Sequence, residues 1–142
     1  MNSDSIHLPY EMKINIEATD IDLLGHVNNV VYLRWVQDVA IAHWFAVATE
    51  SQKKKLLWVV VRHEIDYKRP AYAGDTVIAR TWVGLASRRA FERHTELIRK
   101  SDRKLLARAR TLWCPIDSNT RKPVDVDADV YERFSTQNQT NT

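Results

Sequence analysis

One ten-residue stretch gathers the side chains best suited to chemistry: positions 20–29 read "DIDLLGHVNN". It holds two carboxylates, an imidazole and two amides, and a strongly apolar run follows at once. The usual nucleophiles are absent, because the chain has no G-x-S-x-G elbow and Cys114 lies in an apolar, strand-like context. The chemistry open to this stretch is therefore that of a carboxylate that activates water or attacks directly. The alternative interpretation is a helix cap.

The apolar run predicts a buried helix that would position this stretch. Residues 30–48 contain no Gly or Pro and are too long for a strand. Their polar residues form a narrow stripe, in which Arg34 can pair with Asp38 at helical spacing. The helix would begin near Asn28 and Asn29, where unpaired N–H groups and the positive dipole end favour a developing oxyanion. We expect at least one of these asparagines to cap the helix.

Strands are predicted both before and after this helix in the sequence. Side chains alternate between apolar and polar over residues 7–18, and four further strand-like runs cover 56–67, 75–86, 90–99 and 104–116. Short connections between the last strands favour antiparallel hairpins. The predicted fold class is α+β, with a curved, five-stranded antiparallel sheet over one long central helix. We expect a single domain over residues 1–142, with a core at about 10–134, one short helix near its end and a polar C-terminal tail.

The composition bounds the class of protein. With 142 residues, 44% of them hydrophobic, the chain can bury the core of one domain without disulfides. A single cysteine, no signal-like N-terminus and no apolar run of about 20 residues predict a cytoplasmic protein without a membrane partner. The net charge of +3 suits an anionic small molecule at least as well as nucleic acid. The five histidines lack ligand spacing, which predicts no metal site.

Three segments carry a resemblance to a known family. They read "TDIDLLGHVNNVVYLRWVQD", "HEIDYKRPAYAGDTV" and "TLWCPIDSNTRKPVDV". Over about residues 10–134 the chain resembles the hotdog-fold acyl-coenzyme A thioesterases of the 4-hydroxybenzoyl-CoA thioesterase type. The resemblance implies a helix wrapped by a five-stranded antiparallel sheet. It also implies subunits joined edge to edge into a dimer or tetramer, active sites at the subunit interface, and no cofactor.

The resemblance also implies roles for single residues. Asp22, three positions before the motif glycine, would be the catalytic carboxylate, with His26 and Asn29 as side-chain helpers. The backbone N–H of Asn29 would bind the thioester oxygen, and Gly25 would let the substrate approach closely. The residues expected to bind substrate are Tyr32 in the acyl pocket and Arg88 and Arg89 at the coenzyme A phosphates.

Some residues keep a second interpretation. Asp38 on the helix is the alternative catalytic carboxylate, and Asp20 is expected to be a turn residue that accepts local N–H bonds. Leu24 stands where some family members carry an asparagine, so a mechanism that needs an amide there is in doubt. His63 falls in apolar phase and is expected to be a neutral histidine of the core or interface.

The expected function is hydrolysis of an acyl-CoA thioester to a free acid and coenzyme A. The alternatives are an acyl-carrier-protein thioesterase and a non-catalytic hotdog module that binds acyl-CoA or serves as a dimeric scaffold. Binding of single-stranded nucleic acid is disfavoured, because most of the five tryptophans fall in apolar-phase positions needed for the core.

Overall fold

A computed structural model describes residues 7–135, so the predicted polar tail from residue 136 onward lies outside the described residues. The elements in chain order are β1 (Tyr10–Asn15), the 3-10 turn η2 (Ala18–Asp20), α1 (Asn29–Val47), α2 (Glu50–Lys55), β2 (Leu56–Tyr67), β3 (Thr76–Ala86), β4 (Phe91–Arg99), β5 (Leu105–Asp117) and α3 (Ala128–Phe134). The long helix, the strands and the short helix near the end of the chain all match the predictions. Two short helical elements were not anticipated: the 3-10 turn η2, and α2, which leads into β2.

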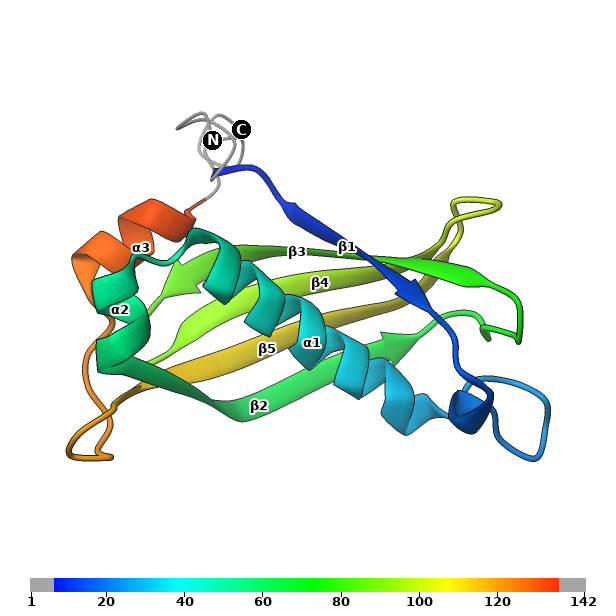
Figure 1. The fold of residues 1–142 in the computed structure, drawn as a ribbon, viewed down its shortest axis with the longest axis horizontal. Coiled ribbons are helices and arrows are strands. Elements are labelled where there is room, and N and C mark those ends of the chain that lie inside the picture. Colours follow the sequence, from blue (N-terminus) through cyan, green and yellow to red (C-terminus); the bar gives the residue numbers. More distant parts are fainter. Residues whose placement is uncertain (1–6, 136–142) are drawn as a thin grey trace.

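The strands form one sheet in the order β1-β3-β4-β5-β2, and every neighbouring pair is antiparallel. The sheet curves along one side of α1 (Figure 1). The hairpins β3–β4 and β4–β5 follow from the short connections seen in the sequence. The predicted α+β architecture, a five-stranded antiparallel sheet around one central helix, is therefore confirmed.

The helix α1 is held against the sheet by an apolar face that runs its whole length. Its first half packs with residues of β3, β4 and β5 in one core cluster, and its second half packs with Phe91 and α3 in another. Asn28 caps the start of the helix, because its side-chain oxygen accepts the N–H of Val30 at 3.2 Å, as the capping prediction required. No helix in the described range 7–135 is long and apolar enough to cross a membrane.

The strand β2 lies at one edge of the sheet, so its outer side has no neighbouring strand within the described chain. It exposes the apolar side chains of Leu57, Val59 and Val61, and α1 exposes Ile41 and Phe45. A long edge strand with exposed apolar residues is a template for pairing with another strand.

Candidate active site

The loop before α1 is a tight turn closed by backbone bonds. The N–H of Asp22 donates to the carbonyl of His26 at 2.7 Å, and the N–H of Gly25 donates to the carbonyl of Asp22 at 3.1 Å. Gly25 has a φ of +83°, a left-handed conformation that side chains with a Cβ rarely adopt. The glycine of the motif is therefore needed by the turn itself, which brings Asp22 and His26 together.

One carboxylate oxygen of Asp22 supports the turn and the other does not. Oδ1 accepts the N–H groups of Leu24 and His26, at 2.9 and 3.3 Å. Oδ2 forms no hydrogen bond with any described residue, and the side chain is partly exposed. The predicted catalytic carboxylate is thus fixed by one oxygen and has the second available for water or a substrate.

The backbone at the start of α1 leaves one N–H group unused. The N–H of Asn28 donates to the carbonyl of Asp20, that of Val30 to the Asn28 side chain, and that of Val31 to the Asn28 carbonyl. Within residues 7–135 the N–H of Asn29 has no acceptor, and the residue is exposed. This N–H lies at the positive end of a 19-residue helix, where a negative oxygen is stabilised.

Asp20 holds the loop to the helix. It is only 2% exposed, and its carboxylate accepts the N–H of Glu17 at 2.9 Å and Nη2 of Arg34 at 2.8 Å. Burial alone would raise the pKa of Asp20, but the bonds from Glu17 and Arg34 outweigh it and hold this pKa below its usual value. The prediction of a turn-forming carboxylate is confirmed. The pairing of Arg34 with Asp38 is wrong, because the guanidinium reaches back to Asp20 instead.

A second loop, residues 68–75, forms a wall beside the first. The hydroxyl of Tyr32 donates to the carbonyl of Arg69 and accepts the N–H of Ala71, whose carbonyl accepts the N–H of Val27. Tyr32 itself is 1% exposed. Within the single chain, the residue expected to bind substrate therefore serves the site by fixing this loop. His26 faces the same loop, because its ring packs edge-on against Tyr72 with centroids 5.6 Å apart.

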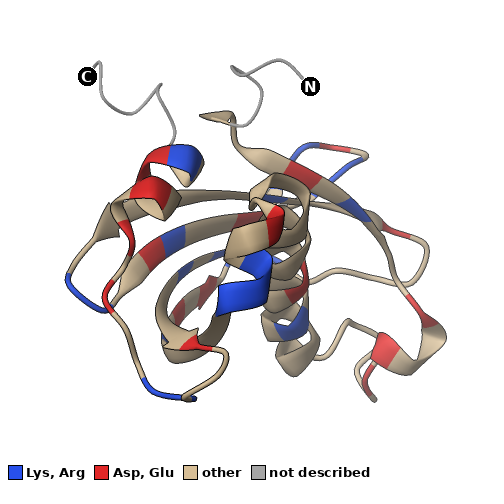
Figure 2. Cartoon of the chain, turned by 60° about the vertical axis from the view of Figure 1, so that its left-hand side comes forward, with Lys and Arg blue, Asp and Glu red and all other residues tan. Residues whose placement is uncertain are grey.

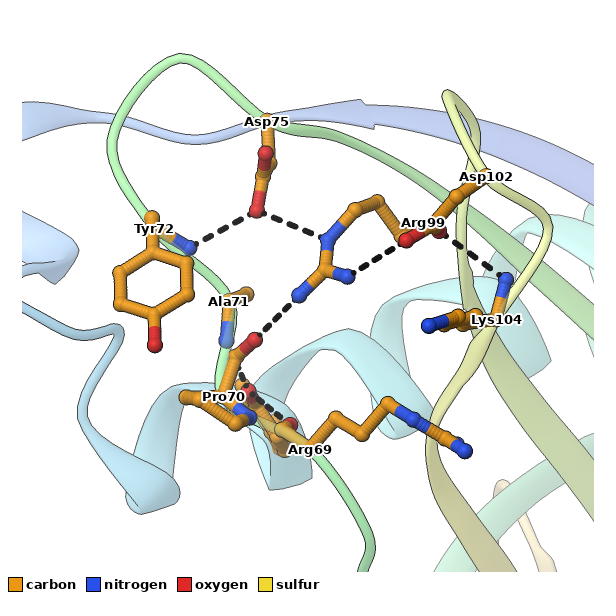
Figure 3. A network of polar contacts seen from close by, with 9 residues as sticks. Arg69, Pro70, Ala71, Tyr72, Asp75, Arg99, Asp102 and Lys104 are labelled. Atoms are coloured by element: carbon orange, nitrogen blue, oxygen red, sulfur yellow. Dashed lines mark hydrogen bonds and ion pairs between the residues drawn. The ribbon is translucent and has the colours of Figure 1, made fainter.

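Arg99 anchors the wall from the end of β4 (Figure 3). Its guanidinium donates to Pro70 O at 2.6 Å, to Asp75 at 3.1 Å and to Asp102 at 2.9 Å. The Asp75 carboxylate also accepts the N–H of Tyr72. Sequence reasoning missed Arg99, because nothing in the local pattern links the end of β4 to a loop about 25 residues earlier.

Arg88 and Arg89 lie at the other end of the sheet from the Asp22 loop. They occupy the β3–β4 turn, and Nε of each lies 3.2 Å from Oδ1 of Asp125. The 11 residues of β3 separate that turn from the loop of Tyr72, a span of about 33 Å. Figure 2 brings this end forward and shows basic segments beside acidic ones. One chain therefore does not bring these arginines to Asp22.

Asp38 is also remote from the loop. It is exposed on α1, about 14 Å along the helix axis from Asn29. His63 is half-buried, with Nδ1 2.9 Å from Thr111 Oγ1 and Nε2 3.3 Å from Gln37 Nε2. Burial lowers the pKa of His63, which supports the predicted neutral state.

A cavity of about 430 Å³ lies between the second half of α1 and the sheet. This volume falls within the range of about 300–1,000 Å³ that is usual for small-molecule sites. The walls are mainly apolar and aromatic, and they include Ala40, Trp44, Trp58, Phe91, Trp113 and Phe134. Sequence reasoning missed this cavity, because its lining comes from all three α-helices and the strands β2 to β5. Across residues 7–135, no group of three or more His, Cys, Asp or Glu side chains could hold a metal ion.

The sequence and the fold match known proteins. Residues 16–134 match the family model of the thioesterase-like superfamily. The chain is 29% identical over 127 residues to oleoyl-acyl carrier protein thioesterase 1, chloroplastic, from Arabidopsis thaliana, a match that covers 88% of this chain and 34% of that protein. It is 25% identical over 113 residues to a chloroplastic palmitoyl-acyl carrier protein thioesterase from Gossypium hirsutum, covering 80% and 27%. The chain thus spans about a quarter to a third of the length of these curated relatives.

Two solved structures share the architecture. A 4-hydroxybenzoyl CoA thioesterase mutant complexed with 4-hydroxybenzoyl CoA superposes with a TM-score of 0.80 at 19% identity, covering 89% of this chain and 99% of that one. DHNA-CoA thioesterase from Staphylococcus aureus gives a TM-score of 0.79 at 19% identity, covering 94% and 93%. At this identity the likeness shows the fold, and it agrees with the predicted hotdog arrangement.

Proposed function

The chain belongs to the thioesterase-like superfamily, and from this premise we propose that it hydrolyses an acyl-CoA thioester to a free carboxylic acid and coenzyme A. The observation that carries the proposal is the pair formed by the free Oδ2 of Asp22 and the unused N–H of Asn29, which flank one short loop. A carboxylate and an oxyanion donor are the two groups that hydrolysis of a thioester needs.

The proposed reaction consumes one water molecule and returns Asp22 to its starting charge. Oδ2 of Asp22 takes a proton from water, whose oxygen forms a bond to the thioester carbonyl carbon. The N–H of Asn29 donates to the resulting oxyanion at the positive end of α1. The carbon–sulfur bond then breaks, and the proton held by Asp22 passes to the thiolate of coenzyme A, directly or through His26. In the alternative nucleophilic form, Oδ2 attacks the carbonyl first and water hydrolyses the acyl-aspartate.

We propose that two subunits complete the site by pairing along β2. A two-fold axis through an antiparallel β2–β2 pair places the Leu56 end of one strand beside the Tyr67 end of the other. Tyr67 marks the catalytic end, because its hydroxyl donates to Asn29 O at 3.2 Å. Arg88 and Arg89 of the partner subunit then approach the Asp22 loop, where they can bind coenzyme A phosphates.

A second candidate is hydrolysis of acyl-carrier-protein thioesters. It is favoured by the curated relatives at 25–29% identity, whose names are those of acyl-carrier-protein thioesterases. Comparing turnover of one acyl group on coenzyme A and on a purified carrier protein separates the two candidates. We also propose a cytoplasmic location, since a chain with a single cysteine, Cys114, forms no disulfide of its own, as is usual in a reducing compartment.

The test is thiol release from short, long and aromatic acyl-CoAs by the wild type, Asp22→Asn and the matched variant Asp38→Asn. We expect Asp22→Asn to lose at least about 100-fold in kcat and Asp38→Asn to keep wild-type rates. Equal activity of Asp22→Asn and the wild type would refute the assigned role of Asp22. Binding of coenzyme A without turnover by the wild type would instead favour a non-catalytic module.

A further inference from the structure

The cavity beside α1 contains a buried guanidinium without a counter-ion. Arg93 on β4 is 7% exposed and lines the cavity. Its Nη1 donates to His43 Nδ1 at 2.8 Å and to Thr81 Oγ1 at 3.1 Å. Within residues 7–135, no carboxylate forms an ion pair with Arg93, and its Nε and Nη2 form no hydrogen bond. Burial lowers the pKa of Arg93 to about 10, which leaves it charged at neutral pH.

The two partners of Arg93 are neutral. A guanidinium only donates, so His43 Nδ1 accepts and the ring proton must lie on Nε2. Burial and the nearby charge of Arg93 lower the pKa of His43 to about 3, so the ring is uncharged at neutral pH. The hydroxyl of Thr81 donates to the carbonyl of His94 at 2.8 Å. Neither partner offsets the positive charge.

The other charged residues that line the cavity are already paired. Lys53 donates to Glu50 at 2.9 Å, and Glu92 accepts from Arg110 at 3.0 Å. The carboxyl end of α1 carries a partial negative charge, but Arg133 donates to the carbonyl of Val47 there. A buried charge is usually paired, because an unpaired one has lost its hydration without gaining a counter-charge. Arg93 therefore lacks a partner that the cavity can admit.

We propose that this cavity binds an acyl group that ends in a carboxylate, and that Arg93 pairs with that carboxylate. The substrate class is then a thioester of a dicarboxylic acid, with the free carboxylate at the far end of the chain. The aromatic walls contact the methylene chain, and the guanidinium supplies the counter-charge that an apolar cavity otherwise lacks. This assignment rests on the proposed thioesterase function and adds its acyl specificity.

The position of the cavity fits an acyl group that extends away from the reacting carbonyl. Arg93 contacts His43, 14 residues and about 21 Å along the axis of α1 from Asn29, which is farther than an acyl chain of up to about ten carbons reaches within one subunit. In the β2 pairing proposed above, the cavity adjoins the Asp22 loop of the partner subunit, and the acyl group enters the cavity from that loop. A hydrocarbon tail that ended at Arg93 would exclude water from the guanidinium and offer it no hydrogen-bond acceptor in return. Binding of methyl-ended chains is therefore disfavoured.

The test uses pairs of acyl-CoAs of equal chain length, one ending in a carboxylate and one in a methyl group: adipoyl and hexanoyl, suberoyl and octanoyl, sebacoyl and decanoyl. We expect the wild type to prefer the carboxylate-ended member of at least one pair by about 10-fold or more in kcat/KM. Arg93→Met should lose about 10- to 100-fold on that member and retain or gain activity on its methyl-ended counterpart. Arg93→Lys should retain part of the preference.

Arg108→Met is the matched control, because Arg108 is an exposed arginine on the neighbouring strand β5. It should leave the preference unchanged. A wild type that hydrolyses methyl-ended chains at least as well as every carboxylate-ended one overturns the proposal while the thioesterase function stands. Equal losses on both members of a pair in Arg93→Met also overturn it, because they indicate a purely structural role.

A binding measurement keeps this specificity separable from catalysis. Free octanoate and octanamide, which differ only in the charged carboxylate, are compared by the rise in Tm that each gives to the wild type. We expect octanoate to stabilise the wild type more strongly, and Arg93→Met to lose the difference. If no thioester is hydrolysed but this difference is seen, the proposed reaction fails and the carboxylate site is retained. Equal shifts from octanoate and octanamide contradict the site even without a folded variant.

Discussion

The buried carboxylate of Asp20 gives the most direct test of how the catalytic loop is held. It accepts one bond from the backbone N–H of Glu17 and one from the guanidinium of Arg34. Asp20→Asn keeps the shape but removes the charge, and its amide N–H₂ group must then face either Glu17 or Arg34, both of which are donors. Hydrogen bonds to charged groups contribute about 1.5–3 kcal/mol, so we expect a loss of that size in the free energy of unfolding.

The matched variant is Arg34→Met. The Arg34 side chain is 53% exposed, so water can replace its guanidinium at Oδ1, and an ion pair of this kind contributes about 0–1 kcal/mol. Asp20→Asn should therefore cost clearly more than Arg34→Met in urea unfolding at neutral pH. Equal losses would refute the argument that the buried bond to Glu17 matters more than the exposed ion pair.

The same carboxylate gives the pH dependence a definite sign. The folded pKa of Asp20 is lowered below its usual value of 3.8, so its stabilisation is fully present above 3.8 and is lost as the pH falls through the folded pKa. The gap in unfolding free energy between the wild type and Asp20→Asn should shrink over that acid range. A gap that stays constant, or widens on acidification, contradicts the assignment.

The other predictions concern the turn and its wall. Gly25→Ala should cost about 1–2 kcal/mol, because φ is +83° although a Cβ would meet no atom within 4 Å, and it should lower thiol release. Gly74→Ala, with φ +89° and equally open surroundings, should cost similar stability and leave turnover much closer to the wild type. Arg99→Met removes three bonds and should speed amide exchange at Ala71 ahead of the sheet. Unchanged exchange at Ala71 would show that other contacts hold the wall.

The fold could be predicted because its determinants are periodic. The alternation of β1 and the unbroken apolar run of α1 each fix an element within the segment itself, and the short hairpin connections fix the strand order in the middle of the sheet. The loop of Asp22 could be predicted for a similar reason: its turn, its glycine and its capping asparagine are neighbours in sequence. The roles assigned to Asp22, His26 and Asn29 remain predictions, which the turnover experiments test.

The parts that could not be predicted depend on contacts between distant segments. Arg34 has an acidic residue one turn away in Asp38, but a buried carboxylate 14 residues earlier binds it instead. The distance between the Arg88–Arg89 turn and Asp22 follows from the length of β3, and no local pattern encodes it. Arg93 did leave a signal, because strand alternation places it on the inner face with Phe91 and Leu97. A charged residue at a strand position that alternation assigns to the apolar face indicates a buried charge that needs a partner.

The two ends of α1 suit two different parts of the proposed function, hydrolysis and recognition of the acyl group, for a physical reason. At its start the helix has an unsatisfied N–H, which suits the carbonyl oxygen that becomes negative during hydrolysis. Its second half presents apolar side chains and the neutral His43 to the sheet, so it can wall a cavity but cannot neutralise a charge inside it. Reaction and recognition therefore need separate groups, Asn29 of one subunit for the oxyanion and the partner subunit's Arg93 for the carboxylate. A ligand that satisfies both must carry one acceptor at each end of an apolar chain.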